Sequence, residues 1–172
     1  MNSAIERLLS LRVSDVMQLN VVRLPSYATL AEAAEIFLKH QISGAPVVDE
    51  RDRCVGILSA MDFVKREQNV ATRGALEQSQ RRQGPTAMLN VGAYDEERID
   101  GYMTSAVQSI AMDATLIQAA EIMCGAHVHR IPVLDGRARP VGMVSSLDIA
   151  AALLQAIEEQ SHSAVNPAEL VP

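Results

Sequence analysis

The stretch that decides the fold occurs twice in this chain, at Val55–Asp62 (VGILSAMD) and again at Val141–Asp148 (VGMVSSLD). The copies lie 86 positions apart, and at that offset residues 13–66 align with residues 99–152 without a gap. Self-similarity at a fixed spacing is typical of a repeated structural unit. The two halves of the sequence are therefore expected to fold alike.

Both halves predict the same order of elements around this stretch. Thr29 and Thr115 are candidate helix N-caps, and Glu32 and Gln118 follow three residues later, which is the capping-box spacing. Apolar residues then recur at helical spacing. In the first half they are Leu30, Ala33, Ala34, Phe37 and Leu38, and in the second they are Leu116, Ala119, Ala120 and Met123.

Short strands separate these helices from a second pair of helices. The predicted strands are Ala45–Val48, Val55–Leu58, Ile131–Leu134 and Val141–Val144, and extended pieces at Val21–Val22 and near Val107 precede each first helix. The final helix is predicted over Leu147–Glu158. The fold class is therefore α+β, built from tandem β-α-β-β-α repeats.

The repeats suggest a division of the chain into five parts. These are an N-terminal helix over residues 1–12, one repeat over 13–66, a polar connector over 67–98, a second repeat over 99–154, and a helix end with a disordered tail over 155–172. Part of the connector is expected to be helical or mobile, since it is long for a compact domain.

Composition and charge exclude several functions. Hydrophobic residues make up 48% of the chain and aromatic residues only 3%, so the core is expected to be aliphatic. A net charge of −6 argues against binding to nucleic acid or to an anionic membrane, since both need clustered Lys and Arg. No apolar run is long enough to span a membrane, and no signal peptide is recognisable, so a cytoplasmic protein is expected. Cys54 and Cys124 are interpreted as buried, reduced thiols.

The repeated Ser-x-x-Asp has two interpretations. Ser59 with Asp62, and Ser145 with Asp148, could simply cap the helices that follow. The same geometry suits a ligand, because a helix N-terminus attracts phosphate and a carboxylate accepts hydrogen bonds from ribose hydroxyls. The glycine before each serine permits close backbone approach.

A second candidate site is the stretch His127–Val133 (HVHRIPV). No third metal ligand is visible near its histidines, so no metal site is predicted. His129 and Arg130 together fit a phosphate clamp. The alternative interpretation is a surface Arg beside a His at the rim, without a ligand. Ser43 and Gly44 hold the equivalent positions in the first half, so the halves are chemically unequal.

No catalytic set is recognisable. The sequence has no nucleophile elbow, no phosphate-binding Walker loop, and no cysteine paired with a plausible histidine and asparagine. The chain is therefore interpreted as not being an enzyme.

These residues carry a family resemblance. The Pro-Val strand, charged turn and Val-Gly-x-x-Ser-x-x-Asp pattern resembles the CBS domain, and two in tandem resemble a Bateman module. His129–Val133 is similar to the phosphate-binding strand of the gamma subunit of AMP-activated kinase. The resemblance implies two repeats packed about a pseudo-twofold axis. It also implies two clefts that take AMP, ADP, ATP or S-adenosylmethionine.

The resemblance also assigns roles to single residues. It implies that Asp62 and Asp148 hold ribose hydroxyls, that Ser59 and Ser145 touch ribose or phosphate, and that His129 and Arg130 meet phosphate. Adenine would be walled by Ala45, Pro46, Ile131 and Pro132, with the backbone near Val22 and Val107. Met103–Thr104 matches the family's Met-Thr, whereas Met17–Gln18 departs from it, which we expect to weaken the matching contact in the first half.

Two functions remain open from the sequence. One is an adenosine-nucleotide sensor that regulates a separate partner protein. The other is a structural homodimerisation module with unoccupied clefts. In either case a homodimer is expected, because the apolar face of the helix over Leu147–Ile157 needs cover.

Overall fold

The computed structural model describes residues 3–80 and 94–163, which fall into two compact units. We call Val22–Val107 the first unit. The second unit combines the chain up to Val21 with the chain from Gln108 onward. Each unit is described by itself below.

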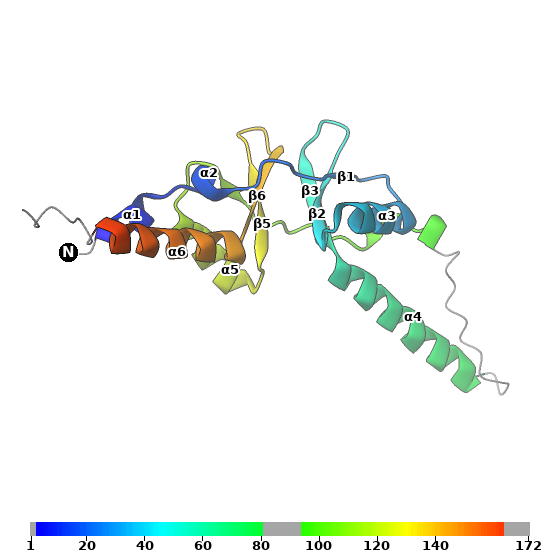
Figure 1. Cartoon of the computed structure of the whole chain (residues 1–172). Coiled ribbons are helices and arrows are strands. Elements are labelled where there is room, and N and C mark those ends of the chain that lie inside the picture. The colour runs from blue at the N-terminus through cyan, green and yellow to red at the C-terminus, as the bar shows by residue number, and fades with distance from the viewer. Residues whose placement is uncertain (1–2, 81–93, 164–172) are drawn as a thin grey trace, which may run out of the picture. The chain divides into compact units, whose positions relative to one another are not determined.

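The first unit contains a three-stranded sheet in the order β1-β2-β3. β1 runs parallel to β2, and β2 runs antiparallel to β3 (Figure 1). The strands are β1 (Leu24–Pro25), β2 (Gly44–Val48) and β3 (Cys54–Ser59), and the helices are α3 (Leu30–His40), α4 (Ala60–Gln80) and the short 3-10 helix η2 (Ile99–Gly101).

The second unit repeats this architecture, with strand order β4-β5-β6 and the same pairing directions. Its strands are β4 (Ile110–Ala111), β5 (Arg130–Leu134) and β6 (Pro140–Ser145), and its helices are α1 (Ser3–Ser10), α2 (Val13–Val16), α5 (Leu116–Ala126) and α6 (Ser146–Ser163). The predicted α+β repeat fold is confirmed.

Capping boxes start α3 and α5 as predicted. The Thr29 and Thr115 hydroxyls each accept the backbone N–H of the residue three positions on, Glu32 and Gln118, at 3.2 Å. The reciprocal bonds from the Thr29 and Thr115 backbone N–H groups measure 2.9 Å. Both helix starts are therefore determined locally, by residues close together in the sequence.

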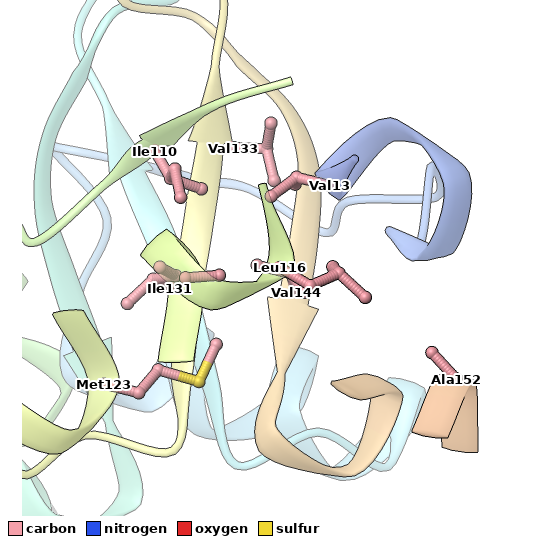
Figure 2. Close-up of a cluster of buried hydrophobic side chains, with 9 residues drawn as sticks. Val13, Ile110, Leu116, Met123, Ile131, Val133, Val144 and Ala152 are labelled. Atoms are coloured by element: carbon pink, nitrogen blue, oxygen red, sulfur yellow. The ribbon is translucent and has the colours of Figure 1, made fainter. Parts of the chain in front are cut away.

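Each unit buries its own aliphatic cluster. In the second unit the cluster joins the sheet to the helices and includes Val13 (Figure 2). The equivalent cluster of the first unit includes Ile99 and is closed by Phe37. Leu38 was predicted to lie on the buried face of its helix, but it is 79% exposed. It lies one position beyond Phe37, so the helix turns it away from the core.

Several element boundaries differ from the sequence prediction, most clearly those of the edge strands, α4 and α6. The edge strands begin at Leu24 and Ile110, later than the extended pieces at Val21–Val22 and Val107, because pairing with β2 and β5 sets their position. α4 continues through the first part of the predicted connector, to Gln80. α6 continues to Ser163, so residues 161–163 of the predicted disordered tail are helical. Residues 81–93 and 164–172, where the rest of those predictions fall, lie outside the described residues.

The leading segment of each sequence repeat, residues 13–21 or 99–107, packs on the sheet of the other repeat. Gln18 exchanges two backbone hydrogen bonds with Met143 of β6, and Thr104 exchanges two with Ile57 of β3. Val13 likewise joins the second cluster and Ile99 the first. The compact units therefore do not coincide with the repeats seen in the sequence.

Candidate ligand site

The strand-to-helix turn between β3 and α4 forms the candidate site of the first unit. The Ser59 hydroxyl donates to Asp62 Oδ2 at 2.7 Å, and the Ser59 backbone N–H donates to the same oxygen at 2.8 Å. Asp62 is buried, with 5% of its surface exposed. The carboxylate is thereby held at the first turn of α4, where the helix dipole favours negative charge.

The turn between β6 and α6 has the same geometry in the second unit. The Ser145 hydroxyl donates to Asp148 Oδ2 at 2.6 Å and its backbone N–H donates at 2.8 Å. The Asp148 backbone N–H completes the box by donating to the Ser145 hydroxyl at 3.2 Å. The capping interpretation of Ser-x-x-Asp thus describes both turns, and it uses only one oxygen of each carboxylate.

The second carboxylate oxygen has a different partner in each unit. Asp62 Oδ1 lies 3.4 Å from Lys65 Nζ, one turn along the same helix. Asp148 Oδ1 instead accepts from Gln18 Nε2 at 3.2 Å. Gln18 lies beside β6, far from Asp148 in the sequence, so only the tertiary structure brings this pair together.

The glycine before each turn allows a methionine side chain to pack closely against the strand. A Cβ built on Gly142 would lie 2.6 Å from Met17 Sδ, and one built on Gly56 would collide with Met103 Sδ. The close approach predicted for these glycines is therefore made by the segment that carries Gln18 or Thr104.

Gln18, which stands where the family pattern has Thr, therefore affects a different site from the one expected. Gln18 was expected to weaken a contact in the first half, but it lies beside Asp148 in the second unit. Thr104, which matches the family pattern, lies beside β3 in the first unit. The reason is the exchange of leading segments, which no local sequence pattern indicates.

Arg130 begins β5 directly opposite Ser145 of β6. Side chains of directly paired residues lie on the same face of a sheet, so Arg130 stands on the face of the Ser145–Asp148 turn. His129 precedes it and its carbonyl accepts the Ser146 backbone N–H at 3.0 Å. Both side chains are exposed, and within residues 3–80 and 94–163 the Arg130 guanidinium has no ion-pair partner.

The residues expected to wall an adenine lie on the central strands. Ala45 and Ile131 belong to the hydrophobic clusters of their units, and Pro46 and Pro132 follow them as buried residues. Val22 and Val107 are half-buried and lie outside the strands. Their contact with adenine stays a prediction.

A model of the CBS domain family matches residues 13–69 and 98–155, which together make up more than half of the chain. The chain belongs to the CBS domain family. The two matches coincide with the two sequence repeats, so the chain carries a CBS pair.

Two curated relatives match most of this chain. An uncharacterised 17.7 kDa protein of Acidianus ambivalens is 25% identical over 83% of this chain and 73% of its own length. The L-aspartate semialdehyde sulfurtransferase of Methanocaldococcus jannaschii is 28% identical over 80% of this chain, yet the match spans only 22% of that enzyme.

Solved structures agree with the fold. The CBS pair of protein MJ0100, solved with 5′-methylthioadenosine and S-adenosyl-L-methionine, has a TM-score of 0.63 and 27% identity over 84% of this chain and 97% of its own. CBSX2, solved with AMP, has a TM-score of 0.64 and covers 84% of this chain and 96% of its own. At 18% identity, the likeness to CBSX2 shows the fold alone.

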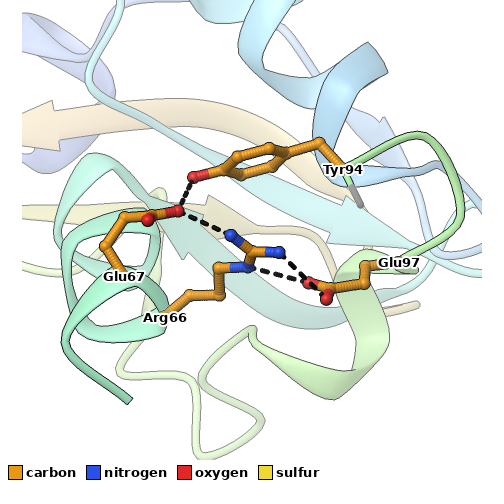
Figure 3. A network of polar contacts seen from close by, with 4 residues as sticks. All are labelled: Arg66, Glu67, Tyr94 and Glu97. Atoms are coloured by element: carbon orange, nitrogen blue, oxygen red, sulfur yellow. Dashed lines mark hydrogen bonds and ion pairs between the residues drawn. The ribbon is translucent and has the colours of Figure 1, made fainter. Parts of the chain in front are cut away.

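The CBS repeats also differ in a polar cluster that sequence reasoning missed. Arg66 of α4, 4% exposed, bonds both oxygens of Glu97 at 2.9 and 3.0 Å and Glu67 Oε1 at 2.6 Å (Figure 3). Its guanidinium carbon lies 4.3 Å from the centre of the Tyr94 ring, and the Tyr94 hydroxyl donates to Glu67. The only signal in the sequence is the 86-residue offset, at which Arg66 aligns with Ala152 and Glu97 with Leu11.

This cluster shifts the ionisation of its members. Hydrogen bonds from Arg66 hold the pKa of Glu97 below its usual value. The Tyr94 hydroxyl, and then Arg66, lower the pKa of Glu67. Burial and the bond to Glu67 raise the pKa of Tyr94. The cluster thus acts as a charged link between α4 and the segment that leads to Thr104.

Neither cysteine is fully buried, contrary to the interpretation from the sequence, because Cys54 is half-buried and Cys124 is exposed.

The described part of the chain contains neither a candidate metal site nor a helix suited to span a membrane. Among residues 3–80 and 94–163, no group of three His, Cys, Asp or Glu side chains is placed to hold a metal ion. Within the same ranges, no helix combines the length and the apolar character that crossing a membrane requires.

Proposed function

We propose that this CBS pair binds adenosine-containing ligands and thereby regulates a separate partner protein. The observation that carries the proposal is the pair of Ser–Asp turns. Each presents a carboxylate whose Oδ2 is committed to the helix cap, whereas Oδ1 has only an exposed side chain as partner. The likeness to the MJ0100 pair, which was solved with two adenosyl ligands, supports the same conclusion.

In this proposal, the Asp62 and Asp148 Oδ1 atoms accept hydrogen bonds from the two ribose hydroxyls. A carboxylate that is already held in one orientation makes such bonds with little further loss of conformational freedom. The N-termini of α4 and α6 add a positive dipole end at each turn. Ala45, Pro46, Ile131 and Pro132 would contact adenine together with the backbone near Val22 and Val107.

Phosphate would be bound in the second unit. Arg130 and His129 stand beside the Ser145–Asp148 turn, and Arg130 is not neutralised by a described carboxylate. On a chain of net charge −6, a local cation is needed to attract a phosphorylated ligand. The ligand class is therefore adenosine nucleotides, AMP, ADP or ATP, together with S-adenosylmethionine.

Thermal unfolding with added ligand tests this function. At about 100 times its dissociation constant, a ligand that binds only the folded state adds roughly 2.7 kcal/mol to stability. AMP, ATP, S-adenosylmethionine and 5′-methylthioadenosine are each added to the wild type and to Asp62→Asn/Asp148→Asn. We expect at least one to stabilise the wild type and to lose most of that effect in the double variant. If none raises the unfolding temperature of the wild type, the function is wrong.

A second candidate function, homodimerisation, rests on a different observation. Exposed apolar side chains recur along α6 at helical spacing: Leu147 is 75% exposed, Leu154 is 61% exposed and Ile157 is 50% exposed. Met61, which aligns with Leu147, is 58% exposed on α4. We propose that a second copy of the chain covers these helices, since monomers rarely leave such surfaces in water.

Light scattering at micromolar concentration tests the dimer. We expect the wild type to have twice the monomer mass and Leu147→Glu to be monomeric. Glu121→Ala, which changes an exposed side chain of α5, serves as a surface control. A monomeric wild type contradicts the dimer and leaves ligand binding untouched.

A further inference from the structure

Gln18 is held firmly beside the Asp148 turn. Its backbone N–H donates to the Met143 carbonyl at 2.9 Å and its carbonyl accepts the Met143 N–H at 3.0 Å. The preceding Met17 packs directly on Gly142 of β6. The backbone of Gln18 is therefore fixed at the edge of the sheet, and only its side chain is free to change its hydrogen-bond partner.

That side chain occupies the oxygen which the proposed function needs. Gln18 Nε2 donates to Asp148 Oδ1 at 3.2 Å, while Ser145 holds Oδ2. Both oxygens of the Asp148 carboxylate therefore already accept hydrogen bonds from the chain itself. A ribose hydroxyl that bonds to Oδ1 has to share this oxygen with the Gln18 amide or replace it.

The first unit has the same backbone and a different side chain. Thr104 is held to Ile57 by two backbone hydrogen bonds of 2.9 and 3.0 Å, and Met103 packs on Gly56. Threonine carries its hydroxyl on Cβ, so its side chain is shorter than that of glutamine and has no amide group to donate to the carboxylate. The partner of Asp62 Oδ1 is instead Lys65, whose side chain is 63% exposed and makes a long contact of 3.4 Å. Because Lys65 is exposed and the contact is long, this ion pair is expected to hold Asp62 Oδ1 only weakly.

We infer that Gln18 is an internal competitor for the ribose at Asp148, and that it gives the two sites of this chain different ligand preferences. The inference rests on the proposed function. The Asp62 turn, with Thr104, binds the unphosphorylated adenosyl group more tightly. The Asp148 turn binds it only by displacing Gln18, and Arg130 offsets this cost when the ligand carries a phosphate. Gln18 thus lowers the affinity of the second unit for every adenosyl ligand, and only a ligand whose phosphate binds Arg130 recovers the loss.

The expected effect is modest because Gln18 is exposed. Replacing an intramolecular hydrogen bond by one to a ligand changes affinity by about three- to tenfold. Gln18→Thr copies the residue that the first unit holds at the same place, so the variant is expected to keep the fold. Equal unfolding temperatures of Gln18→Thr and wild type, measured without ligand, confirm this point.

Titration calorimetry with adenosine and with AMP tests the inference. Asp62→Asn removes the carboxylate charge and replaces one of its two acceptor oxygens by an NH2 group, while the remaining oxygen can still accept the cap bonds from Ser59. Binding in this background therefore reports mainly on Asp148. We expect Gln18→Thr, added to Asp62→Asn, to tighten adenosine binding about three- to tenfold and AMP binding by a similar factor. The reciprocal change, Thr104→Gln in the Asp148→Asn background, is expected to weaken adenosine binding. Unchanged or weaker adenosine binding by Gln18→Thr overturns the inference.

NMR spectroscopy of the wild type tests directly whether the ligand displaces the Gln18 amide from Asp148. The side-chain amide of Gln18 gives an NMR signal, which we expect to move when AMP is added, because the amide leaves Asp148. A Gln18 signal that stays in place while AMP saturates the Asp148 turn overturns the inference and leaves the proposed function standing. Adenosine binding that appears only in Gln18→Thr supports it. If neither wild type nor Gln18→Thr binds any adenosine ligand, the proposed function fails and the inference fails with it.

Discussion

Arg66 and Glu97 form a two-point salt bridge in the first unit, with Nε–Oε2 and Nη2–Oε1 distances of 2.9 and 3.0 Å. At the equivalent places of the second unit, Ala152 and Leu11 take part in the hydrophobic cluster. The same position of the fold is thus held by charge in one repeat and by apolar packing in the other. Both solutions attach the leading segment to the helix that follows the Ser–Asp turn.

Arg66→Met should destabilise the protein. Removing the cation leaves the Glu67 and Glu97 carboxylates close together without their shared positive charge, and breaking a fully buried pair costs about 3–5 kcal/mol. The Glu67 and Glu97 side chains remain 36% and 29% exposed, so we expect a smaller loss of about 1–3 kcal/mol. Urea unfolding at pH 7 measures the loss.

Lys65→Met is the matched control for this change, because it removes a neighbouring cation whose side chain is 63% exposed. We expect a loss of less than about 1 kcal/mol. Arg66→Ala/Glu97→Leu copies the apolar pair of the second unit and should be more stable than Arg66→Ala alone. A double variant that is no better than the single one would show that the salt bridge cannot be replaced by packing.

The contribution of Arg66 should vanish in acid. Arg66 and Tyr94 hold the pKa values of Glu97 and Glu67 below the usual value of about 4.3. Groups with a lowered pKa in the folded state stabilise it above the unfolded pKa, and this stability is lost as pH falls through the folded pKa. The difference in unfolding free energy between wild type and Arg66→Met should therefore be largest near pH 7 and shrink below pH 4.

Urea unfolding of both proteins at several pH values between 7 and 3 measures this difference. Asp49 and Asp135 also have lowered pKa values, because backbone N–H groups of their turns bond to them. They are present in both proteins, so their effect cancels in the comparison. A difference that does not change with pH would mean that Arg66 acts through packing alone.

Gly142→Ala should loosen the segment that carries Gln18. The new Cβ would lie 2.6 Å from Met17 Sδ and 3.1 Å from its Cγ, so the methionine has to move. We expect a loss of about 1–2 kcal/mol, as for other overpacked sites. In a Met17→Ala background the same change should cost much less, since the colliding atoms are gone. Thermal unfolding of the four proteins in this cycle measures the coupling.

Gly136→Ala serves as the control for this cycle, because a Cβ there meets nothing within 4 Å. If Gly142→Ala is as harmless as Gly136→Ala, the methionine rearranges freely and does not anchor the segment.

Arg130→Ala should weaken AMP binding about ten- to a hundredfold and adenosine binding far less. Charge-assisted hydrogen bonds from arginine contribute roughly 1.5–3 kcal/mol, and only the phosphate of AMP receives them. Titration calorimetry with both ligands compares the variant with Arg137→Ala, which removes the same charge from the β5–β6 turn. Equal losses of AMP and adenosine, or no loss, would leave Ser145–Asp148 as a helix cap without a phosphate clamp beside it.

Much of the fold could be predicted from single stretches of sequence. The capping boxes of Thr29 and Thr115, the strands that flank the charged turns, and the Ser–Asp turns all depend on residues a few positions apart. Interactions of this range form in any chain that carries the pattern, so the pattern is enough to predict them. The 86-residue repeat then predicted that both halves fold alike, and the CBS family match agrees with it.

Tertiary structure alone decided which segments meet. The pairing of Gln18 with Asp148, of Thr104 with Ile57, and of Arg66 with Glu97 joins residues that are distant in the sequence. The leading segment of each repeat pairs with a strand through the backbone of one residue, Gln18 or Thr104, and buries the side chain of the methionine before it. Two nearly identical sheets offer it equivalent partners, so the local sequence cannot distinguish them. The choice depends on chain connectivity and on packing of the whole chain, which is why the placement of Gln18 beside Asp148 and of Thr104 beside β3 appeared only in the structure.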